Sequence, residues 1–357
     1  MSSAIASLLD RLLGLIPPFP WYRRLVRPLL FRLPPEAAQQ LAERALGVRS
    51  FWRLAASLHA DGAAHTTMAG IPLRNPVGLA AGFDKQCALL DPLGDLGFGY
   101  VVGGTVTFDA RPGNPRPRLM RLPQRESLIN ALGFPSDGLD AVARRLRALR
   151  RRPAVVLVSI AALDETETER CMEVLEPLVD GIELNISSPN TQGLRRFQEP
   201  DNLRALLERL NARRSKPLFV KLPPYADEPE RENVLSLLRV CAEVGVSGVT
   251  AINTVPTDEP RMATGRGGIS GAAILPDMLR IIPELRREAG GGMTINACGG
   301  IASAADAAAA LDAGADTVQL YTALVYRGPG VVREITAGLA SRELLGTKPK
   351  RTETGSR

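Results

Sequence analysis

One eleven-residue stretch combines side chains that can hold a planar ring with a hydroxyl that can move a proton. It runs from Asn185 to Arg195, reads Asn-Ile-Ser-Ser-Pro-Asn-Thr-Gln-Gly-Leu-Arg, and follows an apolar run that begins at Gly181. Asparagine amides both donate and accept hydrogen bonds, and a serine can transfer a proton when it is assisted. The stretch therefore predicts a binding and proton-transfer site at the end of a buried strand. The alternative is a polar turn that caps a helix at Asn190 or Thr191.

Further carboxamides surround one serine. Four of them come from separate predicted strands or loops, namely Asn130, Asn185, Asn190 and Asn253. Such a set suits a small planar ring rich in N–H and C=O groups. Ser188 lies among them and could remove a proton from carbon if Thr191 or an ordered water carried the proton onward, because an unassisted serine is a poor base. The alternative for Ser188 is a local hydrogen-bonded turn.

Two lysines end predicted strands. Lys85 follows the first strand and Lys221 ends the fifth. A buried ammonium group needs an anionic partner. One such partner is the N1–C2=O edge of a flavin, which becomes anionic on reduction, and another is a substrate carboxylate. Alternatively, both lysine side chains extend along the protein to reach water.

Small and polar residues follow the last two predicted strands. Gly299 and Gly300 follow the seventh strand, and Tyr321 and Thr322 end the eighth. Glycine lets backbone N–H groups approach phosphate oxygens closely, and a helix N-terminus behind them favours an anion. In a closed parallel barrel these two loops form the usual phosphate position. The pattern predicts a phosphate-bearing ligand.

These side chains need a scaffold that brings strand ends together. Eight short apolar runs are predicted as strands: Pro76–Ala81, Tyr100–Val106, Ala154–Ile160, Gly181–Ile186, Leu218–Leu222, Gly248–Ile252, Thr294–Ala297 and Thr317–Tyr321. Helical patterns separate most of them, at Asp137–Arg151, Asn202–Asn211, Glu230–Val244, Ala273–Glu288 and Ser303–Ala313. Eight such units in about 260 residues predict an α/β fold, a (β/α)8 TIM barrel with its chemistry at the carboxyl ends of the strands. The irregular basic connection Arg111–Arg118 is predicted to cross the barrel mouth.

Composition narrows the function further. The chain has 357 residues, 45% hydrophobic content and a net charge of +6, which is typical of a globular protein. Its four cysteines lie far apart with no CxxC pair and it has only two histidines, so neither a disulfide framework nor a His/Cys metal site is predicted. Aromatic residues make up 4%, and no nucleic-acid recognition motif is present. No metal and no nucleic-acid partner are predicted.

The first 48 residues differ from the rest. Leucines recur at helical spacing before residue 17, a proline-rich break follows, and apolar residues then alternate with arginines up to residue 32. A third helix is predicted from Pro35 to about Leu46. No apolar run reaches the roughly 20 residues that span a bilayer, so an amphipathic anchor on a membrane surface is predicted. The alternative is that this segment only packs on the main domain. The predicted units are the helical extension 1–48, the barrel 49–340 and a disordered polar tail 341–357.

A set of motifs resembles those of dihydroorotate dehydrogenases. They are Asn75–Lys85, Gly104–Thr107, Pro112–Asn114, Pro117–Leu122, Asn130–Phe134, Asn185–Arg195, Gly267–Gly271 and Gln319–Thr322. The amphipathic extension, and a serine instead of a cysteine at the base position, resemble the membrane-associated, quinone-using class 2 enzymes. The resemblance covers about residues 21 to 335. It implies FMN-dependent oxidation of (S)-dihydroorotate to orotate, the fourth step of de novo pyrimidine synthesis, with electrons passed to a membrane quinone. It also implies peripheral attachment to the cytoplasmic side of the inner (cell) membrane.

The resemblance implies roles for individual residues. Ser188 would take the C5 proton of dihydroorotate, with Thr191 and Phe134 beside the proton exit. The substrate would contact Lys85, Asn130, Gly133, Phe134, Asn185, Asn190, Asn253 and Thr254. FMN would contact Ala81, Gly82, Lys85, Thr105, Ser159, Asn185, Lys221, Ile252, Gly271, Gly300, Tyr321 and Thr322. The quinone side would comprise Gln39, Arg121 and Tyr321.

Some positions depart from the family pattern. Ser159 stands where the family usually has an asparagine on FMN, and Pro135-Ser136 replaces a usual pair of asparagines. Gln39 stands where many members have a histidine, and Ala323 replaces a usual glycine. Two alternatives therefore stay open. One is a divergent FMN barrel that oxidises another cyclic amide or an enone, and the other is a non-catalytic orotate-binding paralogue.

Overall fold

Eight parallel strands close into a barrel in the computed structural model, which describes residues 21–57, 65–187 and 194–344. The strands follow one another around the barrel in chain order, and the last pairs with the first. They are β3 (Val77–Leu79), β4 (Tyr100–Val106), β7 (Val155–Ala161), β8 (Gly181–Asn185), β9 (Leu218–Lys221), β10 (Gly248–Ala251), β13 (Thr294–Cys298) and β14 (Thr317–Leu320). Each overlaps a predicted strand, so the predicted barrel is confirmed.

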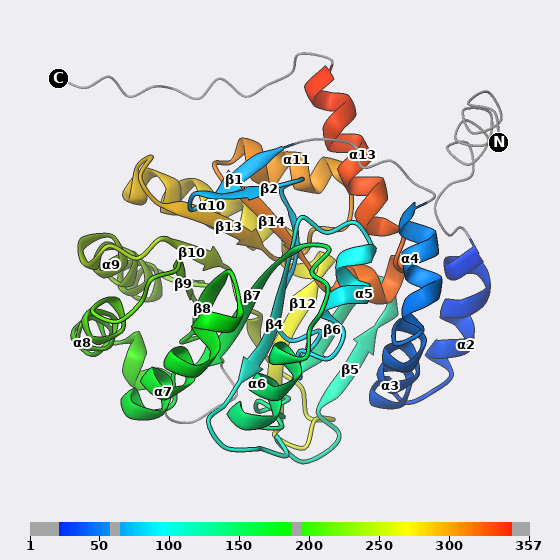
Figure 1. Ribbon diagram of the computed structural model, residues 1–357, viewed down its shortest axis with the longest axis horizontal. Coiled ribbons are helices and arrows are strands. Elements are labelled where there is room, and N and C mark those ends of the chain that lie inside the picture. Colours follow the sequence, from blue (N-terminus) through cyan, green and yellow to red (C-terminus); the bar gives the residue numbers. More distant parts are fainter. Residues whose placement is uncertain (1–20, 58–64, 188–193, 345–357) are drawn as a thin grey trace.

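Helices surround the barrel (Figure 1). The five predicted ones are present, with ends that differ by a few residues, as α6 (Leu139–Arg147), α8 (Pro200–Asn211), α9 (Glu228–Val244), α10 (Leu275–Ala289) and α11 (Ala304–Asp312). Four more are α5 (Leu90–Asp95), α7 (Glu165–Leu175), α12 (Thr322–Arg327) and α13 (Val331–Leu344). The first turn of α7 is highly polar, but Asp164 caps it by accepting hydrogen bonds from the N–H groups of Thr166 and Glu167.

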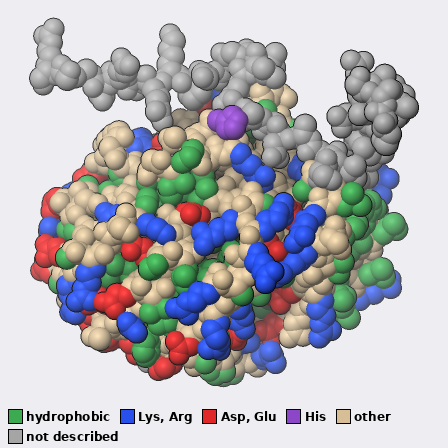
Figure 2. Space-filling view, viewed as in Figure 1, with side chains coloured by type: hydrophobic (Ala, Val, Ile, Leu, Met, Phe, Trp, Pro, Cys, Tyr) green, Lys and Arg blue, Asp and Glu red, His purple; other side chains and the backbone are tan. Residues whose placement is uncertain are grey.

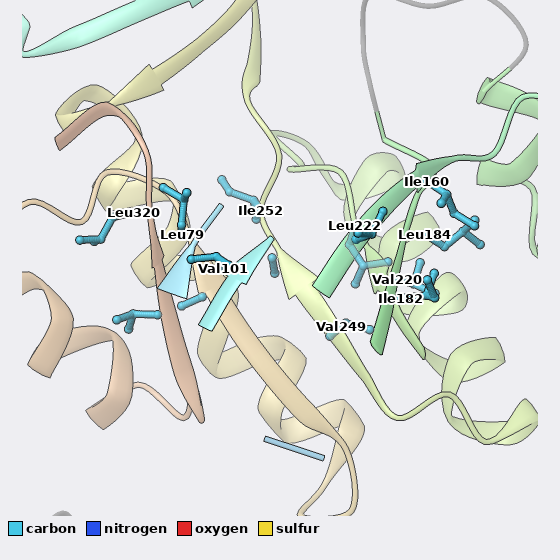
Figure 3. Packing of buried hydrophobic residues seen from close by; sticks show 14 of the residues in the cluster. Leu79, Val101, Ile160, Ile182, Leu184, Val220, Leu222, Val249, Ile252 and Leu320 are labelled. Carbon is cyan, nitrogen blue, oxygen red and sulfur yellow. The ribbon is translucent and has the colours of Figure 1, made fainter. Parts of the chain in front are cut away.

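Apolar and polar side chains alternate along the barrel strands and therefore lie on opposite faces of the barrel wall. Figure 3 shows apolar side chains such as Ile182, Leu184 and Val220 gathered beside the strands. The residues between them, such as Glu183 and Lys221, belong to the other face, because successive strand residues point in opposite directions. The helices thus cover the apolar face, and polar side chains are left for the barrel interior.

A short hairpin closes the amino-terminal end of the barrel. It consists of β1 (Thr66–Met68) and β2 (Ile71–Leu73), and the N–H of Ala69 donates to the Thr294 hydroxyl at the start of β13. Its buried side chains join an apolar cluster with residues of β4, β7 and β9, made of Met68, Leu73, Tyr100, Val102, Leu157 and Phe219. With this end filled, the opposite end is left for a ligand.

A second, antiparallel sheet stands at the carboxyl ends of the barrel strands and was not predicted. Its order is β11 (Val255–Asp258), β12 (Arg266–Gly271), β6 (Ser127–Asn130) and β5 (Leu119–Leu122). All four segments are short, with four to six residues each, so no single one carries a strong strand pattern. The preceding segment 112–118 contains no strand, as predicted, although Arg111 forms an isolated bridge with Ser136.

Four helical segments precede the barrel and lie against one side of it, at the right of Figure 1. They are η1 (Tyr22–Val26), α2 (Arg27–Phe31), α3 (Pro35–Leu46) and α4 (Arg49–Ser57). Side chains attach them to the barrel: the Tyr22 hydroxyl donates to the Val325 carbonyl oxygen at 2.8 Å, and Glu36 accepts from Arg118 Nε at 2.7 Å. Among the residues that the structure describes, no helix is long and apolar enough to cross a membrane.

Candidate active site

A cavity of about 1290 Å³ opens at the carboxyl ends of the barrel strands. It is lined by sixteen of the residues singled out from the sequence: Ala81, Gly82, Lys85, Thr105, Asn130, Gly133, Phe134, Asn185, Lys221, Ile252, Asn253, Thr254, Gly271, Gly300, Tyr321 and Thr322. They come from the barrel strand ends and from β6 and β12 of the second sheet. Ser188, Asn190 and Thr191 lie outside the described residues. The structure thus gathers the described candidates for substrate and cofactor around one space, with a single exception.

The exception is Ser159. Its side chain is fully buried and does not line the cavity. Its hydroxyl instead lies 3.1 Å from that of Thr105, which does line the cavity. The serine is shorter than the asparagine usual in the family, so it contacts a neighbouring side chain behind the wall. The prediction that Ser159 itself contacts the cofactor therefore has no support in this geometry.

Hydrogen bonds connect the amides on one side of the cavity. Asn253 Nδ2 donates to the Ser187 hydroxyl at 2.9 Å, and that hydroxyl lies 3.4 Å from Asn185 Oδ1. Asn185 Nδ2 in turn donates to the Thr105 hydroxyl at 3.2 Å. Because these bonds fix the orientation of both amides, Asn185 and Asn253 are positioned before any ligand binds.

Lys221 is buried at the floor of this cavity. Burial by itself lowers the pKa of a lysine, but the neighbouring Cys298 and Glu183 outweigh it and raise the pKa of Lys221 above its ordinary value. Glu183 is itself buried and accepts a hydrogen bond from the Thr250 hydroxyl at 2.8 Å. Lys221 therefore stays protonated and supplies a fixed positive charge beneath the cavity.

Lys85 is placed in a loop that is anchored by its neighbour. Asp84 accepts hydrogen bonds from the N–H groups of Ala88 and Leu89, at 2.9 and 2.7 Å. Burial lowers the pKa of Lys85, while the carboxylates of Glu43 and Asp84 act in the opposite direction. An anion bound beside Lys85 would stabilise its charged form, because the anion replaces the favourable interactions with water that burial removes.

Two glycines allow the backbone to come close at the other end of the cavity. A Cβ on Gly271 would lie 2.4 Å from the Glu126 carbonyl oxygen, and one on Gly300 would lie 2.6 Å from the Leu275 nitrogen. Both residues have positive φ, at 92° and 76°. The hydroxyls of Ser270 and Thr322 lie 3.0 Å apart at the same end. Backbone N–H groups that a ligand can approach closely, together with two hydroxyl groups, suit the binding of phosphate oxygens.

The loop after β6 is held in an unusual backbone conformation. Gly133 and Phe134 both have positive φ, at 68° and 54°. A Cβ on Gly133 would lie 2.4 Å from Asn114 Oδ1, and Asn114 Nδ2 donates to the Ala131 carbonyl oxygen at 2.9 Å. The segment around Asn114 thus supports the loop that brings Phe134 to the cavity.

A second cavity, of about 680 Å³, lies between the N-terminal helices and the barrel. Its lining includes the three residues predicted for the quinone side, Gln39, Arg121 and Tyr321. Arg121 donates to the carbonyl oxygens of Phe31 and Leu33 at 3.3 and 3.0 Å, and its guanidinium carbon lies 4.7 Å from the centre of the Phe31 ring. Tyr321 lines both cavities, so one aromatic ring stands between them.

Comparison with known proteins shows which family shares this sequence. Residues 63–342 match the sequence profile described as dihydroorotate dehydrogenase. The chain belongs to the dihydroorotate dehydrogenase family. The family predicted from the sequence motifs is therefore confirmed, and the match covers the whole barrel with its second sheet.

Individual relatives agree. The chain is 41% identical over 337 residues to a protein of Roseiflexus sp. (strain RS-1) named dihydroorotate dehydrogenase (quinone), covering 89% of this chain and 93% of the relative. A protein of the same name from Paraburkholderia phymatum is 39% identical over 337 residues, covering 89% and 97%. Among solved structures, the DHODH of Eimeria tenella in complex with ferulenol superposes with a TM-score of 0.72 at 29% identity, covering 80% of this chain and 86% of that one.

Several cavity residues of this dihydroorotate dehydrogenase family member were not among the predicted site residues. Cys298, Gln319 and Ser270 line the first cavity, and Glu43 lines the second. A signal was present for two of them. Cys298 and Gln319 follow the same alternation that points Lys221 inward, so strand periodicity could have found them. Ser270 and Glu43 had no such signal, because their positions depend on the second sheet and on how α3 packs.

Proposed function

We propose that this protein oxidises dihydroorotate to orotate on FMN held in the first cavity, and that a quinone in the second cavity takes the electrons. The observation that carries the proposal is the arrangement of the two cavities. They share Leu119, Leu128 and Tyr321 as wall residues, and only the second is enclosed by the N-terminal helices. A redox group in the first cavity would thus be one side chain away from an apolar chamber.

The residues of the first cavity fit FMN. Gln319 lines the cavity, and both polar atoms of its buried amide lack a hydrogen-bond partner among the described residues. Such an amide suits the N–H and C=O edge of an isoalloxazine ring, and Lys221 suits the same edge when it becomes anionic. The phosphate would lie at Gly271, Gly300 and Thr322. When bound, FMN supplies the acceptor for a hydride.

The substrate would lie among the amides on the open side of the ring. Asn130, Asn185 and Asn253 would hold the N–H and C=O groups of dihydroorotate, and Lys85 would pair with its carboxylate. Ser188 would remove the C5 proton, and the electron pair of that C–H bond would form the C5=C6 double bond of orotate as the C6 hydrogen leaves as a hydride for the acceptor that FMN supplies. Thr191 and Phe134 would border the exit of the proton, and Asn190 would complete the set of amides.

The N-terminal helices support attachment to a membrane surface. Their exposed residues include large apolar side chains, namely Trp21, Leu25, Leu29, Leu33, Leu41, Val48, Phe51 and Leu54. Figure 2 shows hydrophobic and basic side chains together on the right edge of the molecule, where these helices lie. Such a face would lie on the surface of an anionic lipid bilayer, and a quinone would enter the second cavity from the lipid. We place it on the cytoplasmic side of the cell membrane.

A second candidate function is oxidation of another cyclic amide or an enone. It is favoured by the position of Ser159 behind the cavity wall and by Pro135 on the substrate side of the cavity, both of which replace asparagines usual in the family. A substrate screen that follows bleaching of the flavin separates this candidate from the first. Dihydroorotate should bleach the flavin faster than any other cyclic amide tested.

The substitution Ser188→Ala tests the mechanism. In anaerobic stopped-flow mixing with dihydroorotate, the variant should reduce its flavin at least about a hundredfold more slowly, because general-base catalysis contributes roughly that much or more. FMN absorbance and orotate binding should stay as in the wild type. A flavin that is reduced at the wild-type rate would remove Ser188 from its role, and a chain that gains no FMN on reconstitution would contradict the proposed cofactor.

A further inference from the structure

A carboxylate lies in the wall of the second cavity. α3 places Gln39 and Glu43 at positions i and i+4, so both side chains are on one face of the helix and both line the cavity. Gln39 Nε2 donates to Glu43 Oε1 at 2.8 Å. Glu43 is the only acidic side chain among the described lining residues, and most of its neighbours there are apolar. A carboxylate in such surroundings loses hydration, so its presence calls for a chemical explanation.

The other titratable groups around Glu43 are poor proton carriers. Tyr22, Arg121 and Tyr321 line the same cavity. Burial raises the pKa of Tyr22 to about 12, against the lowering effects of Arg27 and Arg121, and burial also raises the pKa of Tyr321. Arg121 is fixed by the backbone carbonyls of α2 and the turn after it. Carboxyl side chains serve as general acids and bases in enzymes, so Glu43 is the candidate for proton transfer among these groups.

Glu43 also acts on the boundary between the cavities. Its charge opposes the lowering of the Lys85 pKa by burial, and it adds to the raised pKa values of Asp84 and Tyr321. Lys85 and Asp84 lie in the loop after β3. Lys85 and Tyr321 both line the first cavity. Glu43 is thus close enough to the shared wall for a quinone that reaches Tyr321 to meet it.

We propose that Glu43 is the proton donor to the quinone. The inference rests on the proposed function, because it requires the quinone to occupy the second cavity. Reduction of a quinone to a quinol takes up two electrons and two protons. The electrons come from the reduced cofactor in the first cavity. The Glu43 O–H bond breaks as a quinone oxygen gains the proton, and Glu43 regains a proton from water before it serves the second oxygen.

The test compares two electron acceptors on the FMN-loaded enzyme. Glu43→Gln keeps the size of the side chain and a partner for Gln39 but cannot donate an acidic proton. After reduction by dihydroorotate, reoxidation by a water-soluble quinone should be about a hundredfold slower in this variant. Reoxidation by ferricyanide, which accepts electrons without protons, should be unchanged.

Matched controls separate a chemical role from a structural one. Glu208→Gln makes the same change at an exposed position of α8 and should leave both reoxidation rates as in the wild type. Equilibrium binding of the quinone to oxidised Glu43→Gln should equal that of the wild type, since the carboxyl is proposed to act on the proton and not on affinity. In D2O the wild type should be slowed with quinone and not with ferricyanide, because only quinone reduction takes up protons, and the slowing should be lost in Glu43→Gln if its remaining rate no longer depends on that proton transfer.

A third variant distinguishes failure of this inference from failure of the proposed function. Ala42→Phe narrows the second cavity without touching the first. If Ala42→Phe leaves quinone reduction intact, the quinone does not bind in this cavity. The proposed quinone site and the proposed role of Glu43 are then both contradicted. If it blocks quinone reduction while Glu43→Gln is as fast as the wild type, the quinone site stands and Glu43 is not the donor.

Discussion

Single residues in this protein are set to their electrostatic roles by burial and by their neighbours. Lys221 ends β9 and Lys85 lies in the loop after β3, and their pKa values move in opposite directions. Lys221 lies near Cys298 and Glu183, whose effect exceeds that of burial. For Lys85 burial outweighs the opposing effect of the Glu43 and Asp84 carboxylates. One lysine therefore provides a permanent charge, and the other provides a charge that depends on what binds beside it.

This difference predicts a pH dependence of orotate binding. The pKa of Lys85 lies below the ordinary lysine value of 10.5, so the free enzyme loses this charge as the pH rises through the lowered pKa. A bound carboxylate favours the charged form, so orotate affinity should be full below that pKa and should decrease above it. A loss of about tenfold corresponds to about 1.4 kcal/mol. Flavin difference spectra recorded with orotate at increasing pH measure it.

Uracil provides the control, because it has the same ring without the carboxylate. Its affinity should show no decrease over the pH range in which orotate affinity falls, apart from any titration of the ring itself. Parallel decreases for both ligands would mean that the pH effect arises elsewhere in the cavity and not at the contact between Lys85 and the carboxylate.

At the scale of elements, one ion-pair cluster attaches α3 to the barrel. Glu36 on α3 accepts from Arg116 and Arg118 in the segment before β5, and the Arg118 side chain is only 10% exposed. Arg118 also donates to the carbonyl oxygens of Pro112 and Asn114. The helix that walls the second cavity is thus connected to the segment that supports the substrate loop.

Removing this attachment should loosen the helices in a pH-dependent way. Burial alone would raise the pKa of Glu36, but Arg118 and Arg116 outweigh it and lower the pKa below its ordinary value of 4.5. Its contribution to stability is therefore complete above pH 4.5 and is lost as the pH falls through the lowered pKa. Glu36→Gln should cost about 1–2 kcal/mol of unfolding free energy at pH 7 and progressively less in acid.

Denaturant unfolding at several pH values measures this cost, and limited proteolysis reports on the helices. Glu334→Gln is the control, because it breaks an ion pair with Arg327 in which Glu334 is 50% exposed. An exposed pair of this kind contributes little. A cost for Glu36→Gln that is no larger than for Glu334→Gln, or that grows in acid, would contradict the assigned role.

At the scale of the whole molecule, the helical extension joins an exposed apolar surface to the wall of the second cavity. η1, α2 and α3 expose one leucine each, Leu25, Leu29 and Leu41. Other residues of α2 and α3, namely Leu30, Phe31 and Ala38, line the second cavity. The same short helices thus have apolar residues on both sides. This is unusual for a surface helix of a soluble domain, and it suits a segment placed between lipid and protein.

Two exposed leucines test that arrangement. The double substitution Leu25→Glu and Leu29→Glu should weaken sedimentation with anionic lipid vesicles by more than about tenfold, because burying a leucine side chain stabilises binding by about 1.5–3 kcal/mol. Flavin reduction by dihydroorotate should be unchanged, since neither leucine lines a cavity. Phe108→Glu, at an exposed apolar residue outside the helices, should leave vesicle binding unchanged. Equal effects of the two changes would argue against a membrane-binding face on α2.

The amino-acid sequence by itself determined the barrel, most of its helices, the family and most of the candidate site residues. Each depends on local patterns: strand periodicity, helix periodicity and motifs whose residues are neighbours in the chain. Lys85, Asn185, Lys221 and Tyr321 could be identified as strand-end residues because parallel barrel strands all deliver their carboxyl ends to one rim.

The tertiary structure alone decided which side chains share a space. Asn130 enters the first cavity because β6 pairs with β12, a segment more than 130 residues later in the chain. Ser159 does not line this cavity, and its hydroxyl lies 3.1 Å from that of Thr105, which does. Glu43 and Tyr321 line one cavity because α3 packs beside β5. Pairings between distant segments depend on the fit of whole surfaces, and no local pattern in the sequence records that fit.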